Sequence, residues 1–322
     1  MNRKQLIMII VGVFLITLVF VNQYSKPNVQ NVTKSRESFI PTDVVKVVPE
    51  SDAFPPILHS DEWMKPVPMS EPINTAGGED SPFVLPDGKT FYFFFTPDVR
   101  VPVEKQLLDG VTGIYVSNML NGSWGKAERV VLQDPGKLAM DGAEFVQGDT
   151  MWFASAREGY TGVNLFTAEF RDGKWTDWRY VGDKLMKEYE VGEMHITADG
   201  SQLYFHSPRA GGKGQLDIWV SRKVSGEWQP PVNVEAANTP ENEGWPFISQ
   251  DGSELWFTRT YQGTPALFRS KNINGDWSEP ELIISQFAGE PSLDNERNIY
   301  FTHHFYRDGK MIEADIYVAY HK

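Results

Sequence analysis

Cysteine is absent from the 322 residues of the chain, which excludes disulfides, thiolate metal ligands, a cysteine nucleophile and a lipidated cysteine anchor. Positive charge is also scarce, because 30 Lys and Arg residues stand against 43 Asp and Glu residues, for a formal net charge of −13. No basic stripe of the kind that binds nucleic acid is present, and no His-Glu-x-x-His pattern indicates a zinc site. We therefore expect neither a nucleic-acid partner nor a cofactor, and leave open only a Ca²⁺ ion held by clustered carboxylates.

Aromatic and turn-forming residues are abundant. The chain contains 10 Trp, 12 Tyr and 20 Phe together with 27 Gly and 21 Pro, and 41% of its residues are hydrophobic. Aromatic segments separated by Gly and Asp turns are typical of β-strands, so the composition predicts an all-β protein with a large core.

The N-terminus differs from the rest of the chain. Arg3 and Lys4 precede an apolar run of 16 residues, Leu6–Val21, and no Ala-x-Ala cleavage pattern follows it. A basic region before an apolar run predicts a signal anchor over residues 1–25, which would hold the chain in the membrane by one helix. A cleaved signal peptide, giving a periplasmic or secreted product, and a buried helix of the fold are the alternatives. Residues 26–56 are polar and predict a linker, which leaves residues 57–322 as the exported domain.

A repeat of four predicted strands occurs five times. Its most regular element is an aromatic residue followed by Phe, found at Tyr92-Phe93, Trp152-Phe153, Tyr204-Phe205, Trp256-Phe257 and Tyr300-Phe301. The fourth strand of the unit carries a tryptophan, at Trp124, Trp175, Trp228 and Trp277, which are 49–53 residues apart. Four-stranded units of about 40–50 residues are typical of β-propeller blades. The sequence therefore predicts a five-bladed β-propeller, in which the tryptophans pack between blades.

The last blade lacks its fourth strand, because the chain ends at Lys322 directly after the third. A segment of the same form, Glu62–Met69 with Trp63, lies at the other end of the domain. An open ring would leave two unpaired sheet edges. We therefore predict that this N-terminal strand completes the last blade and closes the ring.

Two segments carry a resemblance to a known family. They are NTPENEGWPFISQDGSELWFTR and GEMHITADGSQLYFHSPRAGGKGQLDIWVSRKVSGEWQPPVNV, with their Asp-Gly turns, aromatic-Phe strands and Asp-Ile-Trp strand. This pattern resembles the WD40-like PD40 repeat of TolB-type propellers and of bacterial envelope proteins fused to OmpA-like domains. The resemblance covers roughly residues 60–322, although blades 2 and 5, with QGDTMWF and NERNIYF, depart from it. It implies a binding or scaffolding module of the cell envelope.

Acidic residues stand before the first strand of every blade, the strand that lines the channel of a propeller. They are Glu79 and Asp80, Asp141 and Glu144, Glu190 and Glu193, Glu241 and Glu243, and Glu290. Relative to the proline position of each blade, Glu79, Asp141 and Glu243 fall three residues before it, and Glu193 and Glu290 one residue before it. In an extended strand these offsets share one side. The second strands end in cationic residues near the same mouth, namely Arg157, Arg209, Arg259 and His303.

Three interpretations of this mouth remain open. Each acid pairs with an arginine and only fixes the loops, with about 0–1 kcal/mol per exposed pair. Alternatively, the mouth binds a polar envelope ligand (a glycan, a peptidoglycan fragment or a protein partner) without turnover, which is our prediction. Its expected ligand-binding residues are Glu79, Asp141, Glu193, Glu243, Glu290, Arg157, Arg209, Arg259, His303 and Trp245. The third is a glycoside hydrolase that uses Asp80, Asp141 and Glu193 as base, orienting acid and proton donor. Carboxylates paired to arginines would favour the first interpretation, and unpaired ones in a cleft the third.

Overall fold

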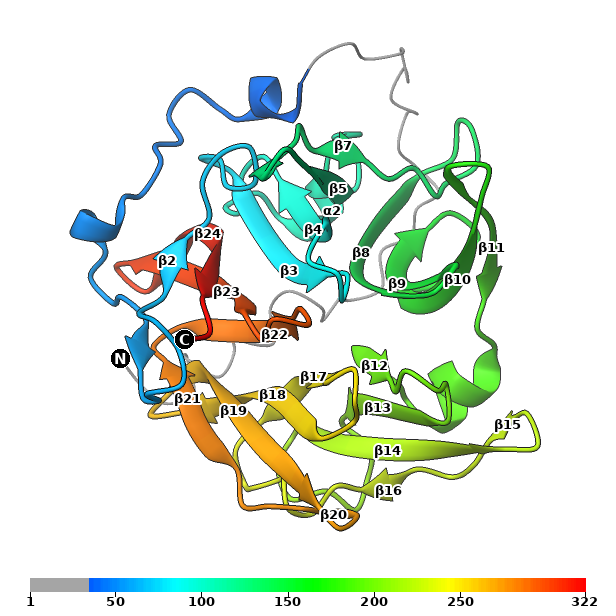
Figure 1. The fold of residues 1–322 in the computed structure, drawn as a ribbon. Coiled ribbons are helices and arrows are strands. Elements are labelled where there is room, and N and C mark those ends of the chain that lie inside the picture. Colours follow the sequence, from blue (N-terminus) through cyan, green and yellow to red (C-terminus); the bar gives the residue numbers. More distant parts are fainter. Residues whose placement is uncertain (1–34) are drawn as a thin grey trace.

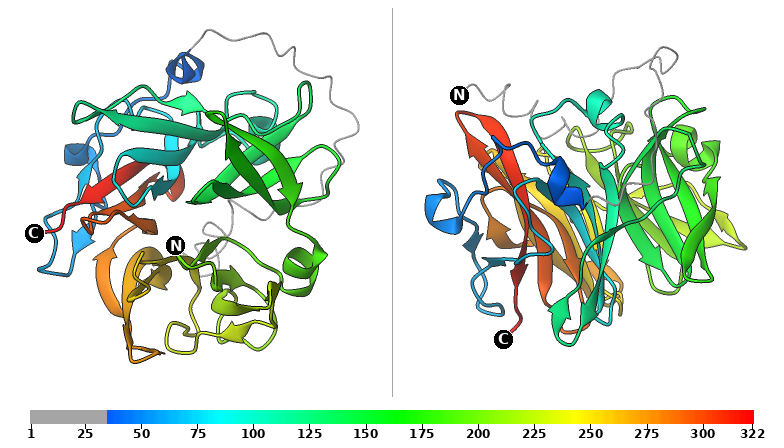
Figure 2. Two further views of the ribbon diagram at one scale, coloured as in Figure 1. Left: turned by 45° about the vertical axis from the view of Figure 1, so that its right-hand side comes forward. Right: turned by 90° about the horizontal axis from the view of Figure 1, so that it is seen from above.

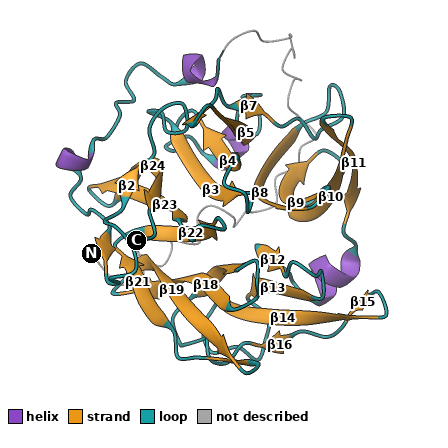
Figure 3. Ribbon diagram, in the orientation of Figure 1, coloured by secondary structure: helices purple, strands orange, loops and turns teal. Residues whose placement is uncertain are grey.

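The computed structural model describes residues 35–322, so the predicted anchor over residues 1–25 and the first part of the predicted linker lie outside the described residues. The predicted all-β class is confirmed: nearly all regular structure is β-strand (Figure 3). The strands form five consecutive antiparallel units around a common centre (Figures 1 and 2). Within residues 35–322, no helix has both the length and the apolar character needed to cross a membrane.

The five units share one strand order from the centre outward. Unit 1 consists of β3 (Gly78–Val84), β4 (Thr90–Thr96), β5 (Gly113–Leu120) and β7 (Glu128–Arg129). Unit 2 consists of β8 (Ala139–Gln147), β9 (Thr150–Arg157), β10 (Val163–Arg171) and β11 (Lys174–Tyr180). Unit 3 consists of β12 (Met194–Ile196), β13 (Gln202–Ser207), β14 (Asp217–Val224) and β16 (Val232–Asn233). Unit 4 consists of β17 (Glu243–Ile248), β18 (Glu254–Tyr261), β19 (Thr264–Ile273) and β21 (Glu281–Ser285). Unit 5 consists of β22 (Ala288–Leu293), β23 (Ile299–Arg307), β24 (Lys310–Ala319) and β2 (Val67–Pro68).

Short elements complete the description. The strands β6 (Ser123–Trp124), β15 (Glu227–Trp228) and β20 (Asp276–Trp277) extend hairpins in units 1, 3 and 4, and β1 (Ile57–Leu58) pairs with β21. The helical turns are η2 (Arg36–Phe39), η3 (Pro49–Ser51), α2 (Val103–Gln106) and η4 (Lys184–Glu188).

The repeated aromatic residues form the core, as their spacing predicts. The Phe of each aromatic-Phe pair is fully buried in all five units, at Phe93, Phe153, Phe205, Phe257 and Phe301. Two of the four predicted fourth-strand tryptophans contact second-strand aromatic rings of the preceding unit, whereas Trp124 lies against Phe91 of its own unit at a centroid distance of 5.4 Å. The ring centroids are 6.3 Å apart for Trp175 and Tyr92, and 6.1 Å apart for Trp277 and Tyr204. Trp175 and Trp277 therefore join one unit to the next.

The outer strand of unit 5 comes from the N-terminal side of the domain. Strand β2 pairs with β24 in the register Val67↔Val318. Nearer the N-terminus, Trp63 forms an isolated antiparallel β-bridge with His321. Trp63 is fully buried, and its ring centroid lies 5.5 Å from that of Trp256 in unit 4. Trp63 thus makes in unit 5 the contact that Trp175 and Trp277 make in their units.

Residues 35–56, called the strap below, pack along the outside of units 1 and 5 (dark blue in Figure 1). Arg36 inserts into unit 1 and is 5% exposed. In unit 5, Lys46 pairs with Glu313 at 2.6 Å, and Asp52 lies 3.0 Å from His303. The described part of the predicted linker therefore belongs to the packed domain.

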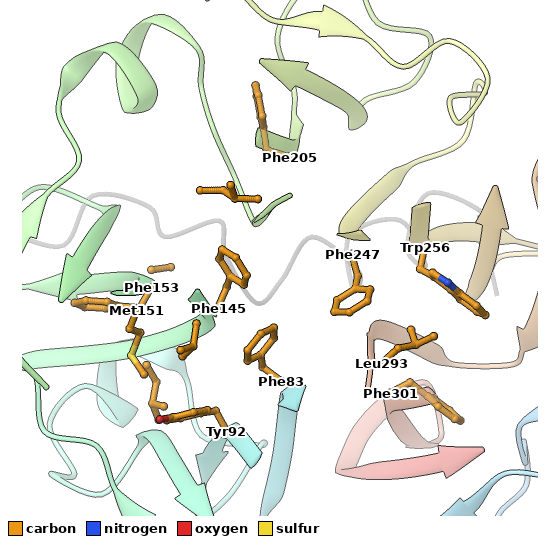
Figure 4. Packing of buried hydrophobic residues seen from close by; sticks show 14 of the residues in the cluster. Phe83, Tyr92, Phe145, Met151, Phe153, Phe205, Phe247, Trp256, Leu293 and Phe301 are labelled. Carbon is orange, nitrogen blue, oxygen red and sulfur yellow. The ribbon is translucent and has the colours of Figure 1, made fainter. Parts of the chain in front are cut away.

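Side chains pack into one part of the centre between the five units. Phe83, Phe145, Phe247 and Leu293 reach it from the innermost strands of four units (Figure 4). The fifth innermost strand contributes His195, whose ring centroid lies 4.3 Å from that of Phe145 and 4.5 Å from that of Phe247. Burial lowers the pKa of His195 to about 3, so this histidine is neutral and acts as a packing residue.

Candidate functional site

A β-bulge interrupts the innermost strand of four units. The register shifts between Asp80 and Phe83 and at the corresponding points of β8, β17 and β22. One residue in each bulge has a positive φ: Ser81 (49°), Ala143 (49°), Trp245 (51°) and Glu290 (59°). Such a conformation costs a residue with a side chain about 1–2 kcal/mol, so the surrounding structure must hold it. Glu193 occupies the same sequence position in unit 3, and these five are called the bulge residues below.

The bulge residues meet in a pocket of about 530 Å³ at the centre of the units. All five line it, one from each unit, together with Asp80 and His304. Its remaining wall is largely apolar and includes Phe94, Tyr306 and the segment 99–104 that follows β4. Pockets of this size that combine an apolar wall with a few polar groups are typical of small-ligand sites.

The bulge also corrects one expectation from the sequence. Acids three residues and one residue before the proline position do not share one side, because the extra residue in the bulge breaks the period-two alternation. Glu79 and Glu243 are fully buried within their units and are not part of the pocket lining. Glu193 and Glu290 line the pocket instead. Asp141 does both, since it lines the pocket and pairs inside its unit.

Unit 2 shows how the buried acids are neutralised. Arg157 lies 2.7 Å from Asp141, and both side chains are almost inaccessible. Ser155 donates to the same carboxylate oxygen at 2.6 Å. The guanidinium carbon is 5.2 Å from the ring centroid of Phe153 and 4.4 Å from that of Phe166. The arginine is therefore inserted between the second and third strands of its own unit.

Unit 4 repeats the same arrangement. The Arg259 Nε lies 2.9 Å from Glu243 Oε1, and the guanidinium carbon is 4.5 Å from the ring centroid of Phe268. The backbone N–H of Thr239 donates to the other oxygen of Glu243 at 3.1 Å. Burial raises the pKa of Glu243 to about 7, and Thr239 and Arg259 oppose this rise.

Unit 1 receives its cation from the strap. Arg36 Nη1 donates to Glu79 at 3.1 Å, and Arg36 Nη2 donates to the carbonyls of Pro72 and Ile73 at 2.6 Å each. The guanidinium carbon is 4.7 Å from the ring centroid of Phe95. Sequence analysis missed this role. The available signal was that unit 1 has a glutamate but no cation two or four residues past its Phe.

The predicted cations of the mouth therefore lie elsewhere than predicted. Arg157, Arg209, Arg259 and His303 are not part of the pocket lining. The Arg209 guanidinium packs at 4.9 Å from the ring centroid of Trp219, and His303 is fully buried beside Asp52. The physical reason is the aromatic rings of the second and third strands, which draw each cation into its own unit.

The pocket itself contains a pair of carboxyl groups that share their hydrogen-bond donors. The backbone N–H of Ser81 donates to Asp80 at 2.6 Å and to Glu290 at 2.8 Å. The Thr302 hydroxyl lies 3.1 Å from the same oxygen of each acid. Burial raises the pKa of Glu290 well above its usual range, and the charge of Asp80 adds to the rise. Burial acts in the same direction on Asp80, but the hydrogen bonds with Glu290, Ser81 and Thr302 and the electrostatic effect of His304 together outweigh it and lower the pKa of Asp80. Asp80 is therefore the ionised member and Glu290 the protonated one.

Two further carboxyl groups surround this pair. Burial raises the pKa of Glu193 to about 8, the charge of Asp80 adds to this, and the nearby indole of Trp245 opposes it. Glu144, only 5% exposed, has a pKa well above its usual range because of burial and the charges of Asp80 and Glu193. Within residues 35–322, neither carboxyl oxygen of Glu144 has a hydrogen-bond partner. Burial thus favours the protonated form of these three glutamates, whereas the lowered pKa of Asp80 favours its ionised form.

The two histidines near the pocket have lowered pKa values, which favour their neutral form. Burial lowers the pKa of His304, which lines the pocket, despite the opposing charge of Asp80. Burial also lowers the pKa of His206 to about 4; its ring lies 3.3 Å from the backbone nitrogens of both Glu193 and Trp245. Among residues 35–322, no three His, Asp or Glu side chains are grouped so as to hold a metal ion.

No family model matches the chain, and no curated protein matches it. The chain is structurally similar to β-propeller proteins with which it shares little sequence identity. One is a putative TolB from Agrobacterium tumefaciens, at 15% identity and a TM-score of 0.43, covering 71% of this chain and 70% of that one. Another is GH43B of a xyloglucan PUL from Bacteroides ovatus, at 17% identity and a TM-score of 0.48, covering 79% of this chain and 54% of that one.

A third similar structure is a GH62 hydrolase in complex with xylotriose, at 11% identity and a TM-score of 0.45, covering 80% of this chain and 96% of that one. The class that the strand pairing itself defines is an all-β fold of five consecutive antiparallel units. Membership of the WD40-like PD40 repeat family stays a prediction from the sequence.

Proposed function

We propose that the chain is a non-enzymatic propeller of the cell envelope that binds a polar ligand in its central pocket. A glycan, a peptidoglycan fragment or the polar end of a protein partner would suit this role. The observation that carries the proposal is the pocket of about 530 Å³, to which all five units contribute a bulge residue. Repeated residues that only pack are buried inside the units, whereas the bulge residues differ from unit to unit and face one space.

In this proposal the pocket acids recognise the ligand, in place of the arginines that the sequence predicts. Asp80, Glu193 and Glu290 offer one carboxylate and two carboxylic O–H donors, and the Trp245 ring offers an apolar face. Hydroxyl and amide groups of a ligand would satisfy these groups without a covalent step.

Binding can be tested by isothermal titration of the full chain with purified muropeptides and a panel of envelope glycans. The Trp245→Ala variant removes a pocket side chain, and Trp228→Ala removes a partly exposed tryptophan of unit 3 that does not line the pocket. We expect Trp245→Ala to weaken binding at least about tenfold, or ~1.4 kcal/mol, and Trp228→Ala to leave it unchanged. Equal binding by wild type and Trp245→Ala would contradict the proposal.

The propeller in this proposal is a closed ring of five blades. Its support is the pairing of β2 with β24 and the position of Trp63, which packs as the fourth-strand tryptophan of unit 5. The envelope location rests on the basic and apolar pattern of residues 1–25. Fractionation of cells tests it: an anchored product retains residues 1–25 in the membrane fraction, and a soluble product without them would indicate cleavage.

A second candidate function is glycoside hydrolysis, because the pKa values of Asp80 and Glu193 move in opposite directions. A low-pKa carboxylate beside a high-pKa carboxylic acid is the combination that a base and a proton donor need. Asp141 suits the orienting role less well, because Arg157 and Ser155 already hold its carboxylate. Release of reducing sugar from plant or bacterial polysaccharides, abolished by both Asp80→Asn and Glu193→Gln, would replace the binding proposal with this one.

A further inference from the structure

Several buried carboxylates of the units are each paired with an arginine or a lysine. Glu79, Asp141 and Glu243 each have a guanidinium partner at 2.7–3.1 Å. In unit 5, the strap lysine Lys46 neutralises Glu313 and Asp315 in the same way. Each of these five acids thus has a cation partner, whereas the buried acids Asp217 and Asp294 are held by uncharged hydrogen-bond donors.

Four acids at or beside the pocket have no such partner. No Lys or Arg within residues 35–322 forms an ion pair with Asp80, Glu144, Glu193 or Glu290. Arg100 lines the pocket, but its guanidinium is held by Asp98 at 2.8 Å and Asp43 at 3.0 Å. The acids instead act on one another across four units: besides burial, the charges of Asp80 and Glu193 raise the pKa of Glu144 and Glu290, and the charge of Asp80 raises that of Glu193. Ionisation of this cluster as pH rises destabilises the domain unless a bound cation offsets the negative charge.

Two independent observations indicate that the missing charge belongs to a ligand. First, the acids surround an open volume of about 530 Å³ rather than packed side chains. Second, Glu144 is 95% buried beside Asp80 and Glu193, yet both its carboxyl oxygens lack a partner within residues 35–322. A buried carboxyl without a hydrogen-bond partner is costly; Glu144 lies outside the pocket lining, where it adds to the acidic surroundings that a cation in the pocket would meet.

We propose that the central pocket recognises a ligand through a protonated amine, with the ammonium group lying among Asp80, Glu193 and Glu290. An ammonium has three N–H donors, of which two match the adjacent carboxyl groups of Asp80 and Glu290, and Glu193 of a third unit lines the same pocket. The aromatic faces of Trp245 and Tyr306, both in the lining, add a cation–π surface. The carboxylic O–H groups that stay protonated would donate to hydroxyl oxygens of the same ligand.

This chemistry narrows the proposed function, on which it rests. An amino sugar or a hydroxyl-rich amine satisfies the pocket, whereas uronic acids and phosphorylated sugars would place a negative charge against Asp80. Neutral sugars would satisfy the O–H donors but would leave Asp80 without a counter-charge. Among envelope ligands, the inference selects those with a free amino group.

Proton release accompanies binding in this scheme. The titratable groups around the ammonium are Asp80 on β3, Glu144 on β8, Glu193 before β12, Glu290 on β22 and His304 and Tyr306 on β23, with Arg100 and Glu104 on the segment after β4. A cation among them favours ionised carboxyls, so Glu193 and Glu290 lose protons when the ligand binds.

The test uses three probes that share one ring and differ in charge: glucosamine, glucose and glucuronate. The full chain is titrated with each at pH 7 by calorimetry, in two buffers of different ionisation heat. We expect glucosamine to bind at least about tenfold, or ~1.4 kcal/mol, more tightly than glucose, glucuronate to bind most weakly, and only glucosamine to release protons. The preference for glucosamine should disappear in Asp80→Asn and weaken in Glu193→Gln, whereas Glu188→Gln, an exposed acid that does not line the pocket, should keep it.

The outcomes separate this inference from the proposed function. Equal binding of glucose and glucosamine, both lost in Trp245→Ala, would overturn the amine inference and leave the pocket as a neutral glycan site. Tighter binding of glucuronate would also overturn it. If no probe binds while muropeptides do in a Trp245-dependent manner, the inference fails and the function stands. If neither the probes nor any muropeptide or glycan binds, both fail.

Discussion

Replacing Arg36 by methionine should destabilise the domain, although Arg36 lies outside every repeated unit. Arg36→Met keeps an unbranched side chain among the rings of Phe93, Phe95 and Tyr115 but removes four hydrogen bonds, of which three go to Glu79 and the carbonyls of Pro72 and Ile73. The carbonyls of Pro72 and Ile73 lose their guanidinium donor, at about 1–3 kcal/mol for each buried group left unpaired.

The electrostatic part of this cost depends on pH. Burial already raises the pKa of Glu79 to about 7, against the opposing charge of Arg36. In the variant, Glu79 escapes the penalty at pH 7 by taking a proton, which limits the added cost to about 1 kcal/mol. The total at pH 7 is then about 3–7 kcal/mol, a range that includes the ~3–5 kcal/mol typical of buried pairs that lose one partner.

The sign of the pH effect follows from the direction of the pKa shift. A carboxyl whose pKa is raised by folding stabilises the domain below its unfolded value of 4.5, and that stability is lost as pH rises through the folded value. In wild type this loss ends near pH 7, where Glu79 ionises beside Arg36. In Arg36→Met the folded pKa is higher, so the loss continues, by up to ~1.4 kcal/mol for each further pH unit.

Urea unfolding followed by tryptophan fluorescence at pH 6, 7 and 8.5 measures both effects. The double variant Arg36→Met, Glu79→Gln should show a cost that no longer grows with pH. Arg171→Met is the matched control, because Arg171 pairs with Glu169 and Asp177 on the surface with 58% of its side chain exposed; its cost should stay below about 1 kcal/mol. An Arg36→Met cost below about 1 kcal/mol, or one that is independent of pH, would refute the reasoning.

Three further predictions concern the ring, the inner strands and the pocket. Trp63→Ala should cost about 3–5 kcal/mol, and deletion of residues 62–69 should lower the thermal unfolding midpoint of the whole domain, because Trp63 is fully buried against unit 4; unchanged unfolding of the deletion would disprove closure by this segment. Gly142→Ala should cost about 1–3 kcal/mol, since its new Cβ would lie 2.9 Å from the Phe94 ring, whereas Gly148→Ala meets no neighbour and tests only the strain of a positive φ. Glu193→Gln should flatten the fall in unfolding midpoint between pH 5 and 8, because the pKa of Glu193 is raised to about 8 and its stabilising proton is lost over that range; a profile as steep as that of wild type would show that Glu193 is not the titrating group.

The fold could be predicted from the sequence because its information is periodic. The aromatic-Phe pairs and the tryptophans each recur at the same place in the unit, and the contacts that they make, such as Trp175 with Tyr92, join neighbouring units. A residue that packs in one unit therefore predicts packing in the others.

The site could be predicted only in part. Asp80, Glu193, Glu290 and Trp245 were placed correctly at the centre because they precede the innermost strands. The sequence did not predict that Glu79 and Glu243 point away from the pocket. Their direction depends on a one-residue bulge, which only the following proline indicates locally. The strap could not be predicted at all, since Arg36 and Glu79 are 43 residues apart and no repeat links them.

The bulge residues have a consequence for how this domain can change over evolutionary time. Five single codons, spread over more than two hundred positions of the gene, encode side chains that converge on one space. Because the packing is carried by other residues, a substitution at Ser81, Ala143, Glu193, Trp245 or Glu290 alters what the space presents to a ligand and leaves the blade framework in place. The packed units thus tolerate exchange of the five bulge residues. Related genes would be expected to diverge fastest at these five positions when their ligands differ.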